Sequence, residues 1–181
     1  MPISAFKLIT PTSIVVAGGT ASVGQFGKVS FSAATSLSLN GVFSSTYDNY
    51  MVAIRTLSTV NGPTIRARLR ANGTDNTTAS SYVYQFLQAD STLVQGTRTT
   101  GDFWGFIGSD DGQRSGAMAY IFAPYLAQPT AFRTISGAGY LDAWLIDYAG
   151  THNQSTAYDG ITVYQGSGSF SGEIAVYGCN Q

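Results

Sequence analysis

Apolar and polar residues alternate at every second position over much of this chain, the pattern of β-strands with one buried face. Between residues 50 and 55 the apolar positions are Tyr50, Val52 and Ile54, with their neighbours on the opposite face. Between residues 65 and 71 apolar residues alternate with three arginines. The same period predicts strands at residues 50–55, 65–71, 82–87, 103–107, 117–122, 131–136, 143–148, 160–164 and 173–177.

Short turn sequences separate these segments and favour antiparallel connections. They are Asn61–Gly62, Asn72–Gly73, Asp111–Gly112 and Ser167–Gly168. No segment shows a sustained helical period of 3.6 residues. The spacing of strands and turns predicts an all-β fold, an antiparallel β-sandwich of jelly-roll type with a short extended N-terminal arm. A chain of 181 residues suits one domain, which we place at residues 23–181.

Residues 1–22 form a separate segment that contains Pro2 and Pro11 and is too apolar for a free tail. Two alternatives follow. The segment is an extra edge strand of the same sandwich, or it is an extended arm that docks onto a neighbouring subunit, where proline is tolerated. Its apolar residues are interface candidates: Phe6, Leu8, Ile9 and Ile14. We read no signal peptide and no membrane span in it.

A Tyr-Asp pair stands directly before a strand twice, at Tyr47–Asp48 and at Tyr158–Asp159. Each pair follows a short polar turn. We interpret both as corners of the sheet, in which the aspartate accepts hydrogen bonds from nearby backbone amides and the tyrosine packs against the sandwich edge.

Charged residues make up only 10% of the chain, and the formal net charge is −1. Nucleic-acid binding and attraction to an acidic membrane both need a basic surface, so we expect neither. Ser, Thr, Asn, Gln and 21 glycines take the place of the missing charges. The surface is therefore hydrated mainly through hydroxyl and amide groups.

The residues of catalytic and metal sites are scarce. The one histidine, His152, falls in a polar stretch and is predicted to be a solvated loop residue, and Cys179 has no base beside it. Asp75 and the pair Asp110–Asp111 could offer oxygen ligands to calcium, but Asp beside Gly is first a turn signal. With Glu173 the only glutamate, a glycosidase carboxylate pair is disfavoured. We predict a protein that is not an enzyme and holds no cofactor.

Arginines and aromatic residues supply the remaining candidates for an interface. Arg66, Arg68 and Arg70 point to one face of one strand, about 7 Å apart. They either pair with carboxylates on a solvent face or meet another subunit. Trp104 and Trp144 either pack in the core or between subunits, or form a platform on which a sugar ring stacks. Trp104 is counted with the interface candidates.

Three blocks, residues 38–55, 65–85 and 156–178, resemble a family of small jelly-roll proteins in tailed bacteriophages, especially those of cyanobacteria and marine bacteria. The resemblance extends over about residues 29–178. It implies a structural protein of the virion, in a tail fibre or receptor-binding tip or as capsid decoration, and it carries over no catalytic residue. Residues 97–150 have no counterpart in it, and there we expect partner specificity to vary.

The resemblance sets our expectations about partners and location. We expect a homotrimer on the exterior of a phage particle, made in the host cytoplasm and bound to other virion structural proteins. A tail or fibre component that contacts the host, with a host-surface glycan as a candidate partner, is preferred over a decoration protein that cements the head shell. A free carbohydrate-binding module, or a glycan hydrolase built on a sandwich, is the alternative of a different class.

Overall fold

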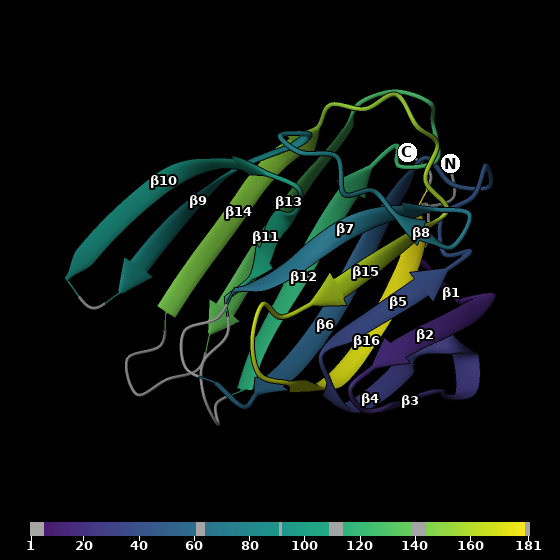
Figure 1. Ribbon diagram of the computed structural model, residues 1–181, viewed down its shortest axis with the longest axis horizontal. Helices are drawn as coiled ribbons and strands as arrows, with labels where there is room; N and C mark the ends of the chain where they lie inside the picture. The colour runs from purple at the N-terminus through teal and green to yellow at the C-terminus, as the bar shows by residue number, and fades with distance from the viewer. Residues whose placement is uncertain (1–5, 61–63, 91, 109–113, 139–143, 180–181) are drawn as a thin grey trace.

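A computed structural model describes residues 6–60, 64–90, 92–108, 114–138 and 144–179. It confirms the predicted all-β fold, a sandwich of two antiparallel sheets of jelly-roll type (Figure 1). The predicted turns at Asn61–Gly62 and Asp111–Gly112, the Asp110–Asp111 pair and the first five residues lie outside the described residues. In the described part of the chain, no helix is long and apolar enough to cross a membrane.

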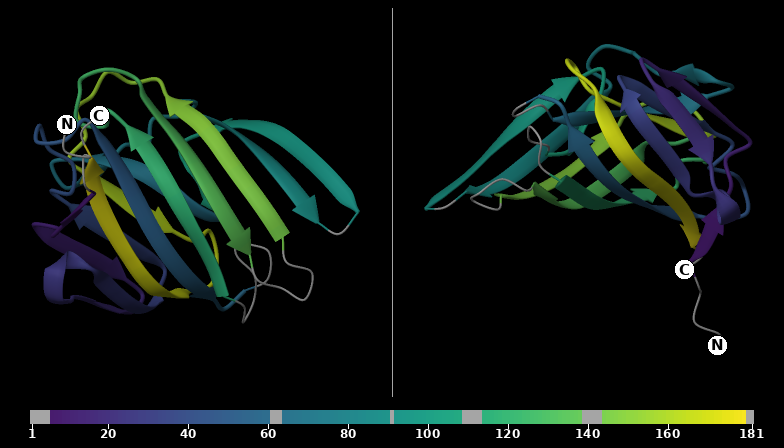
Figure 2. Two further views of the ribbon diagram at one scale, coloured as in Figure 1. Left: turned by 180° about the vertical axis from the view of Figure 1, so that it is seen from behind. Right: turned by 90° about the horizontal axis from the view of Figure 1, so that it is seen from below.

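The two sheets differ in width. The large sheet has ten strands, β10 (Leu93–Gly101), β9 (Tyr82–Asp90), β14 (Trp144–His152), β13 (Thr130–Ala138), β12 (Arg114–Phe122), β6 (Asn49–Ser58), β16 (Phe170–Cys179), β4 (Val29–Ala34) and β3 (Thr20–Val23), with β1 (Lys7–Ile9) also paired to β16. The small sheet has six, β11 (Trp104–Ile107), β7 (Ile65–Ala71), β15 (Gly160–Tyr164), β5 (Ser36–Asn40) and β2 (Ser13–Ala17), with β8 (Thr74–Asp75) beside β7. Seen from behind, the large sheet forms one continuous curved layer (Figure 2).

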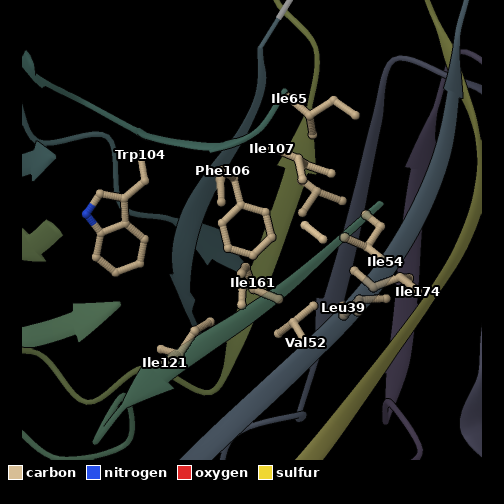
Figure 3. Packing of buried hydrophobic residues seen from close by; sticks show 14 of the residues in the cluster. Leu39, Val52, Ile54, Ile65, Trp104, Phe106, Ile107, Ile121, Ile161 and Ile174 are labelled. Atoms are coloured by element: carbon tan, nitrogen blue, oxygen red, sulfur yellow. The ribbon is translucent and has the colours of Figure 1, made fainter. Parts of the chain in front are cut away.

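The core lies between the sheets and follows the alternation in the sequence. Tyr50, Val52 and Ile54 of β6 are buried, as predicted, and the register places Val52 between Ala119 of β12 and Val176 of β16. The small sheet faces them with Ile, Leu, Phe and Trp side chains (Figure 3). Burying each large apolar side chain contributes about 1.5–3 kcal/mol, so this layer is the main source of stability.

The described part of the N-terminal segment lies within the sandwich. β2 pairs with β5, β3 with β4 and β1 with β16. The structure therefore agrees with the first alternative, strands added to the same sandwich, for residues 7–9, 13–17 and 20–23. Docking of this segment onto another subunit stays a prediction.

The two Tyr-Asp pairs lie at corners of the sandwich. The carboxylate of Asp159 accepts a hydrogen bond from the backbone N–H of Asn72 at 3.1 Å. Tyr47 packs edge-on against Tyr50, whose hydroxyl donates to the carbonyl of Ser44 at 2.8 Å. The tyrosine contacts fix the chain where it enters β6, and the bond from Asn72 fixes it where it enters β15. Tyr158 is fully buried, so its ring packs in the core and not against the sandwich edge as predicted.

The single histidine is fully buried at the end of β14, which corrects the prediction of a solvated loop residue. The polar stretch around it continues β14, and His152 pairs there with Thr130 and Tyr82 on the inner face. Its Nδ1–H donates to the Ser81 carbonyl at 3.1 Å, so Nε2 accepts from the Tyr158 hydroxyl at 2.5 Å. Burial lowers the pKa of His152 to about 4, although the bond to Ser81 opposes this shift. The imidazole is neutral at pH 7.

The buried histidine predicts acid sensitivity. Unfolded His152 takes up a proton near pH 6.5, whereas the folded ring does so only near pH 4. The free energy of unfolding should therefore fall by about 3 kcal/mol as the pH drops through this window. Urea unfolding of the wild type and of His152→Gln between about pH 7 and about pH 4 measures this. The variant should lose this part of the pH dependence, and equal pH slopes would contradict the assignment.

Candidate functional site: an aromatic cleft at the edge of the small sheet

The large sheet extends beyond the small one on the side of β9 and β10 (Figure 1). Strand β11 is the edge of the small sheet, and it lies over β13, β14 and β9. Beyond this edge no strand of the small sheet covers the large sheet, and every described residue of β10 is exposed or only half-buried. The inner face of β9 and β14 next to β11 is therefore only partly covered: Tyr84, Ile146 and Tyr148 are buried, whereas Phe86 and Trp144 are half-buried.

Aromatic side chains line the inner face of β9 and β14 beside β11. Tyr84 and Phe86 come from β9, and Trp144 and Tyr148 come from β14, all from inward-facing positions. They border a pocket of about 110 Å³, which we call the aromatic cleft. Its other lining residues are Thr64, Gln88, Gly108 and Ile146.

The tyrosines of the cleft form one aromatic group. The ring centroids of Tyr84 and Tyr148 are 6.1 Å apart, and those of Phe86 and Tyr148 are 6.0 Å apart. Burial raises the pKa of Tyr148 to about 12 and also raises that of Tyr84. Both hydroxyls are therefore neutral at pH 7, and each remains a donor as well as an acceptor.

Gly105 on β11 makes the position of these rings possible. A Cβ atom at this residue would lie 2.7 Å from Tyr84 Cε2 and 2.8 Å from Tyr148 Cε1. The two rings therefore pass directly over the backbone of the edge strand. A side chain of any size here would push them away from the cleft.

Beyond Gly105 the aromatic surface continues onto the outer face of the small sheet. Phe103 is 6.4 Å from Tyr84 and 6.3 Å from Tyr164 between ring centroids. The guanidinium of Arg66 lies 4.2 Å above the Phe103 ring, and that of Arg68 lies 4.8 Å above the Tyr164 ring. We call Arg66, Arg68, Phe103 and Tyr164 the arginine–aromatic strip.

The three predicted arginines have different environments. Arg66 and Arg68 belong to the strip, and Arg68 also forms an ion pair with Asp102. Arg70 is buried instead. It pairs with Asp75 and donates hydrogen bonds to Asn40 Oδ1 at 3.0 Å and to Thr162 Oγ1 at 2.7 Å. Arg70 therefore connects β7 to β5, β8 and β15 within the small sheet. It is not a surface residue, so its prediction as an interface candidate is corrected.

Trp104 is also not a surface residue. It is fully buried, stacks on Phe132 with ring centroids 4.3 Å apart, and donates its indole N–H to the Thr151 carbonyl at 3.1 Å. The prediction of an interface role for Trp104 is therefore corrected, and core packing is its role. The other tryptophan, Trp144, is half-buried and lines the cleft.

The N-terminal candidates lie far from this strip in the sheet order. Leu8 and Ile9 are half-buried on β1 beside β16, and Ile14 is half-buried on β2, at the opposite edge of the small sheet from β11. Phe6 is exposed. The structure does not bring these four residues together with the arginines.

Groups that support catalysis or metal binding are not assembled in the described chain. No three His, Cys, Asp or Glu side chains among the described residues converge as metal ligands. Asp75, considered above for calcium, pairs with Arg70. Burial raises the pKa of the Cys179 thiol, which therefore stays protonated at pH 7. The described lining of the aromatic cleft contains no carboxylate.

The sequence did not point to Tyr84, Phe86 and Tyr148 as site residues. For Trp144 it left two alternatives open, packing in the core or between subunits and a platform for a sugar ring. A signal was present, because Tyr82, Tyr84 and Phe86 alternate on one face of β9. The width of the small sheet decides which of these aromatic residues are covered. Tyr82 is fully buried, whereas Phe86 is half-buried.

No protein-family model and no curated protein sequence matches this chain. Among solved structures, it is similar to domain 4 of AbnA, a GH43 extracellular arabinanase from Geobacillus stearothermophilus, with a TM-score of 0.38 and 13% identity over 93% of this chain and 83% of that chain. The C-terminal CBM6 of LamC, a marine laminarinase from Zobellia galactanivorans, gives a TM-score of 0.27 and 12% identity over 92% of each chain. Scores this low carry no conclusion about ligand or activity.

Gly105 provides a test of the site geometry. Gly105→Ala places a methyl group against both tyrosine rings, and such overpacking costs about 1–3 kcal/mol. The melting temperature should fall by roughly 3–10 °C. Gly137→Ala on β13 is the control, because no described atom lies within 4 Å of the added Cβ. Equal melting temperatures for the two variants would contradict the placement of Tyr84 and Tyr148 over β11.

Proposed function

We propose that this protein is a non-catalytic glycan-binding β-sandwich and that the aromatic cleft binds a saccharide. The observation that carries this proposal is the group of aromatic side chains on the partly covered inner face of β9 and β14. Core residues at these positions would be hidden by a second layer, whereas Phe86 and Trp144 are only half-buried. Partly exposed aromatic rings in a concave site are typical of ligand-binding pockets.

The chemistry of the cleft suits a sugar ring. Sugars present an apolar face of C–H groups and a rim of hydroxyl groups, so they need a flat aromatic surface with polar groups beside it. Trp144 and Phe86 supply the surface. Gln88 and the hydroxyl groups of Thr64 and Tyr148, which are hydrogen-bonded to each other, supply donors and acceptors at its border.

Binding is favoured over hydrolysis by the composition of the cleft. A glycosidase needs two carboxyl groups on either side of the scissile bond. The described carboxylates of Asp75, Asp102, Asp147 and Glu173 are each held in an ion pair with an arginine. The one histidine is buried and neutral.

We further propose that the protein is displayed on the exterior of a tailed-phage particle, as a tail or fibre component that contacts the host. The resemblance of residues 38–55, 65–85 and 156–178 to virion proteins supports this location. Most of the segment without a counterpart, residues 97–150, folds as β10 to β14 and contributes Trp144 and Tyr148 to the cleft. A scaffold shared with the family, with part of the cleft supplied by a segment that has no counterpart in it, suits host contact better than capsid decoration.

The outer face of the large sheet supports assembly into an oligomer. Exposed apolar side chains lie there on neighbouring strands: Leu87 on β9, Met118 on β12, Ile135 on β13 and Leu145 on β14. An exposed apolar face of this extent is typical of a surface that is covered in an assembly. The proposed assembly is the homotrimer expected from the resemblance.

Tryptophan fluorescence tests saccharide binding. A glycan array of neutral and acidic oligosaccharides identifies ligands, and titration with these should change the emission of Trp144, because Trp104 is buried in the core. Measured by isothermal titration calorimetry, which does not depend on Trp144 emission, Phe86→Ala and Trp144→Ala should weaken binding roughly tenfold or more, as expected for a ring that stacks on the ligand. Tyr125→Ala removes an exposed aromatic ring outside the cleft and should leave the affinity unchanged. An array without ligands, or equal affinity in all variants, would contradict the proposal.

Labelling of intact particles tests the location. Gold-conjugated antibody should bind at the tail or its fibres, and label on the head shell would favour the decoration role instead. Light scattering should give the mass of a trimer, and Met118→Lys or Ile135→Lys should lower this mass by placing a charge on the outer face. A monomeric wild type that is absent from particles would contradict the virion proposal.

A further inference from the structure

Arg66 has an unusual environment next to the aromatic cleft. Phe103 covers one side of its guanidinium, at 4.2 Å from the ring centroid, and the backbone of Gly166 lies beside it. A Cβ atom at Gly166 would lie 3.0 Å from Arg66 Cζ, so the glycine leaves room for the guanidinium. Packing therefore fixes the position of this cation at the border between the cleft and the strip.

Unlike its neighbours on β7, Arg66 has no acidic partner in the described part of the chain. Arg68 pairs with Asp102 and Arg70 pairs with Asp75. The remaining described ion pairs join other cations: Lys28–Glu173, Arg55–Glu173 and Arg133–Asp147. The guanidinium of Arg66 therefore contacts the Phe103 ring and the Tyr164 side chain, and its positive charge is not neutralised by a described carboxylate.

The positive charge of Arg66 extends to the cleft. It lowers the pKa of Tyr84, against the larger effect of burial, so the two groups interact electrostatically. Phe103 contacts both residues, with its ring 6.4 Å from that of Tyr84. Tyr84 is buried and Phe103 half-buried, so a ligand that extends from the cleft across Phe103 would bring its substituents to the edge of the guanidinium.

We propose that the cleft and the strip together recognise a saccharide that carries a carboxylate, a uronic-acid or sialic-acid type of sugar. The proposal rests on the glycan-binding function proposed above. Phe103 covers one face of the guanidinium, and the Tyr164 hydroxyl interacts with its N–H groups. The remaining N–H groups along its edge are those that a ligand would contact. A planar carboxylate accepts two parallel hydrogen bonds from such an edge. The sugar ring would stack on the neighbouring aromatic side chains.

Binding assays with matched sugars test this inference. The probes are oligogalacturonate, oligoglucuronate and sialyllactose, each compared with its carboxyl-reduced, neutral form, and a sulfated oligosaccharide. We expect the wild type to bind at least one carboxylated probe roughly 10- to 100-fold more tightly than its neutral form, as for a charge-assisted hydrogen bond. This preference should decrease as the salt concentration rises.

Variants assign the preference to one residue. Arg66→Gln should remove the preference and keep the affinity for the neutral form, and Arg66→Lys should retain only part of it, because lysine lacks the planar fork. Arg114→Gln makes the same change in charge at an exposed position on β12 and should keep the full preference. Each variant is first shown to have the wild-type melting temperature.

The outcomes separate this inference from the function on which it rests. Equal affinity of the wild type for carboxylated and neutral probes would overturn the inference and keep the glycan-binding function. A preference that persists in Arg66→Gln, or a stronger preference for sulfate than for carboxylate, would overturn the assignment to Arg66. A wild type that binds no saccharide would overturn both.

Discussion

The difference in width between the two sheets is the constraint on which the other features depend. A ten-stranded sheet cannot be covered by a six-stranded one, so part of its inner face must face solvent or be covered by side chains. The apolar layer between the sheets ends at β11, where Trp104 and Phe106 are still fully buried (Figure 3). Past this strand, Tyr84 and Tyr148 take over the covering role by passing above Gly105.

This edge connects the core with the proposed function. The tyrosines that close the core also form the wall of the aromatic cleft, so stability and binding share the same residues. Phe103 links the cleft to the arginine–aromatic strip, because its ring lies 6.4 Å from that of Tyr84 and 4.2 Å from the guanidinium of Arg66. Aromatic surface, neutral hydroxyls and one cation without a described acidic partner thus lie along a single edge. Such a combination is suited to recognition, and the described lining of the cleft holds no carboxylate pair of the kind that a hydrolase needs.

Local patterns in the sequence predicted the fold well, because strand periodicity depends only on which residues face the core. They predicted Tyr50, Val52 and Ile54 correctly for this reason. The errors arose where the sheet order decides: His152 looked like a loop residue, yet β14 continues through it between two other strands. The sequence could not distinguish the environments of Trp104 and Trp144. Trp104 lies on β11 and is buried against the large sheet, whereas Trp144 lies beyond β11 and lines the cleft.

The central claim is that a sugar binds at the uncovered edge beside Trp144, and the two indole N–H groups report on it directly. In a two-dimensional ¹H–¹⁵N spectrum they give separate signals, one from the cleft and one from the core. Titration with oligogalacturonate, with the other carboxylated probes and with their carboxyl-reduced forms should shift the Trp144 signal and leave that of Trp104 in place. If Trp144 stays unshifted at saturating sugar, or if only Trp104 responds, the aromatic cleft is not the binding site.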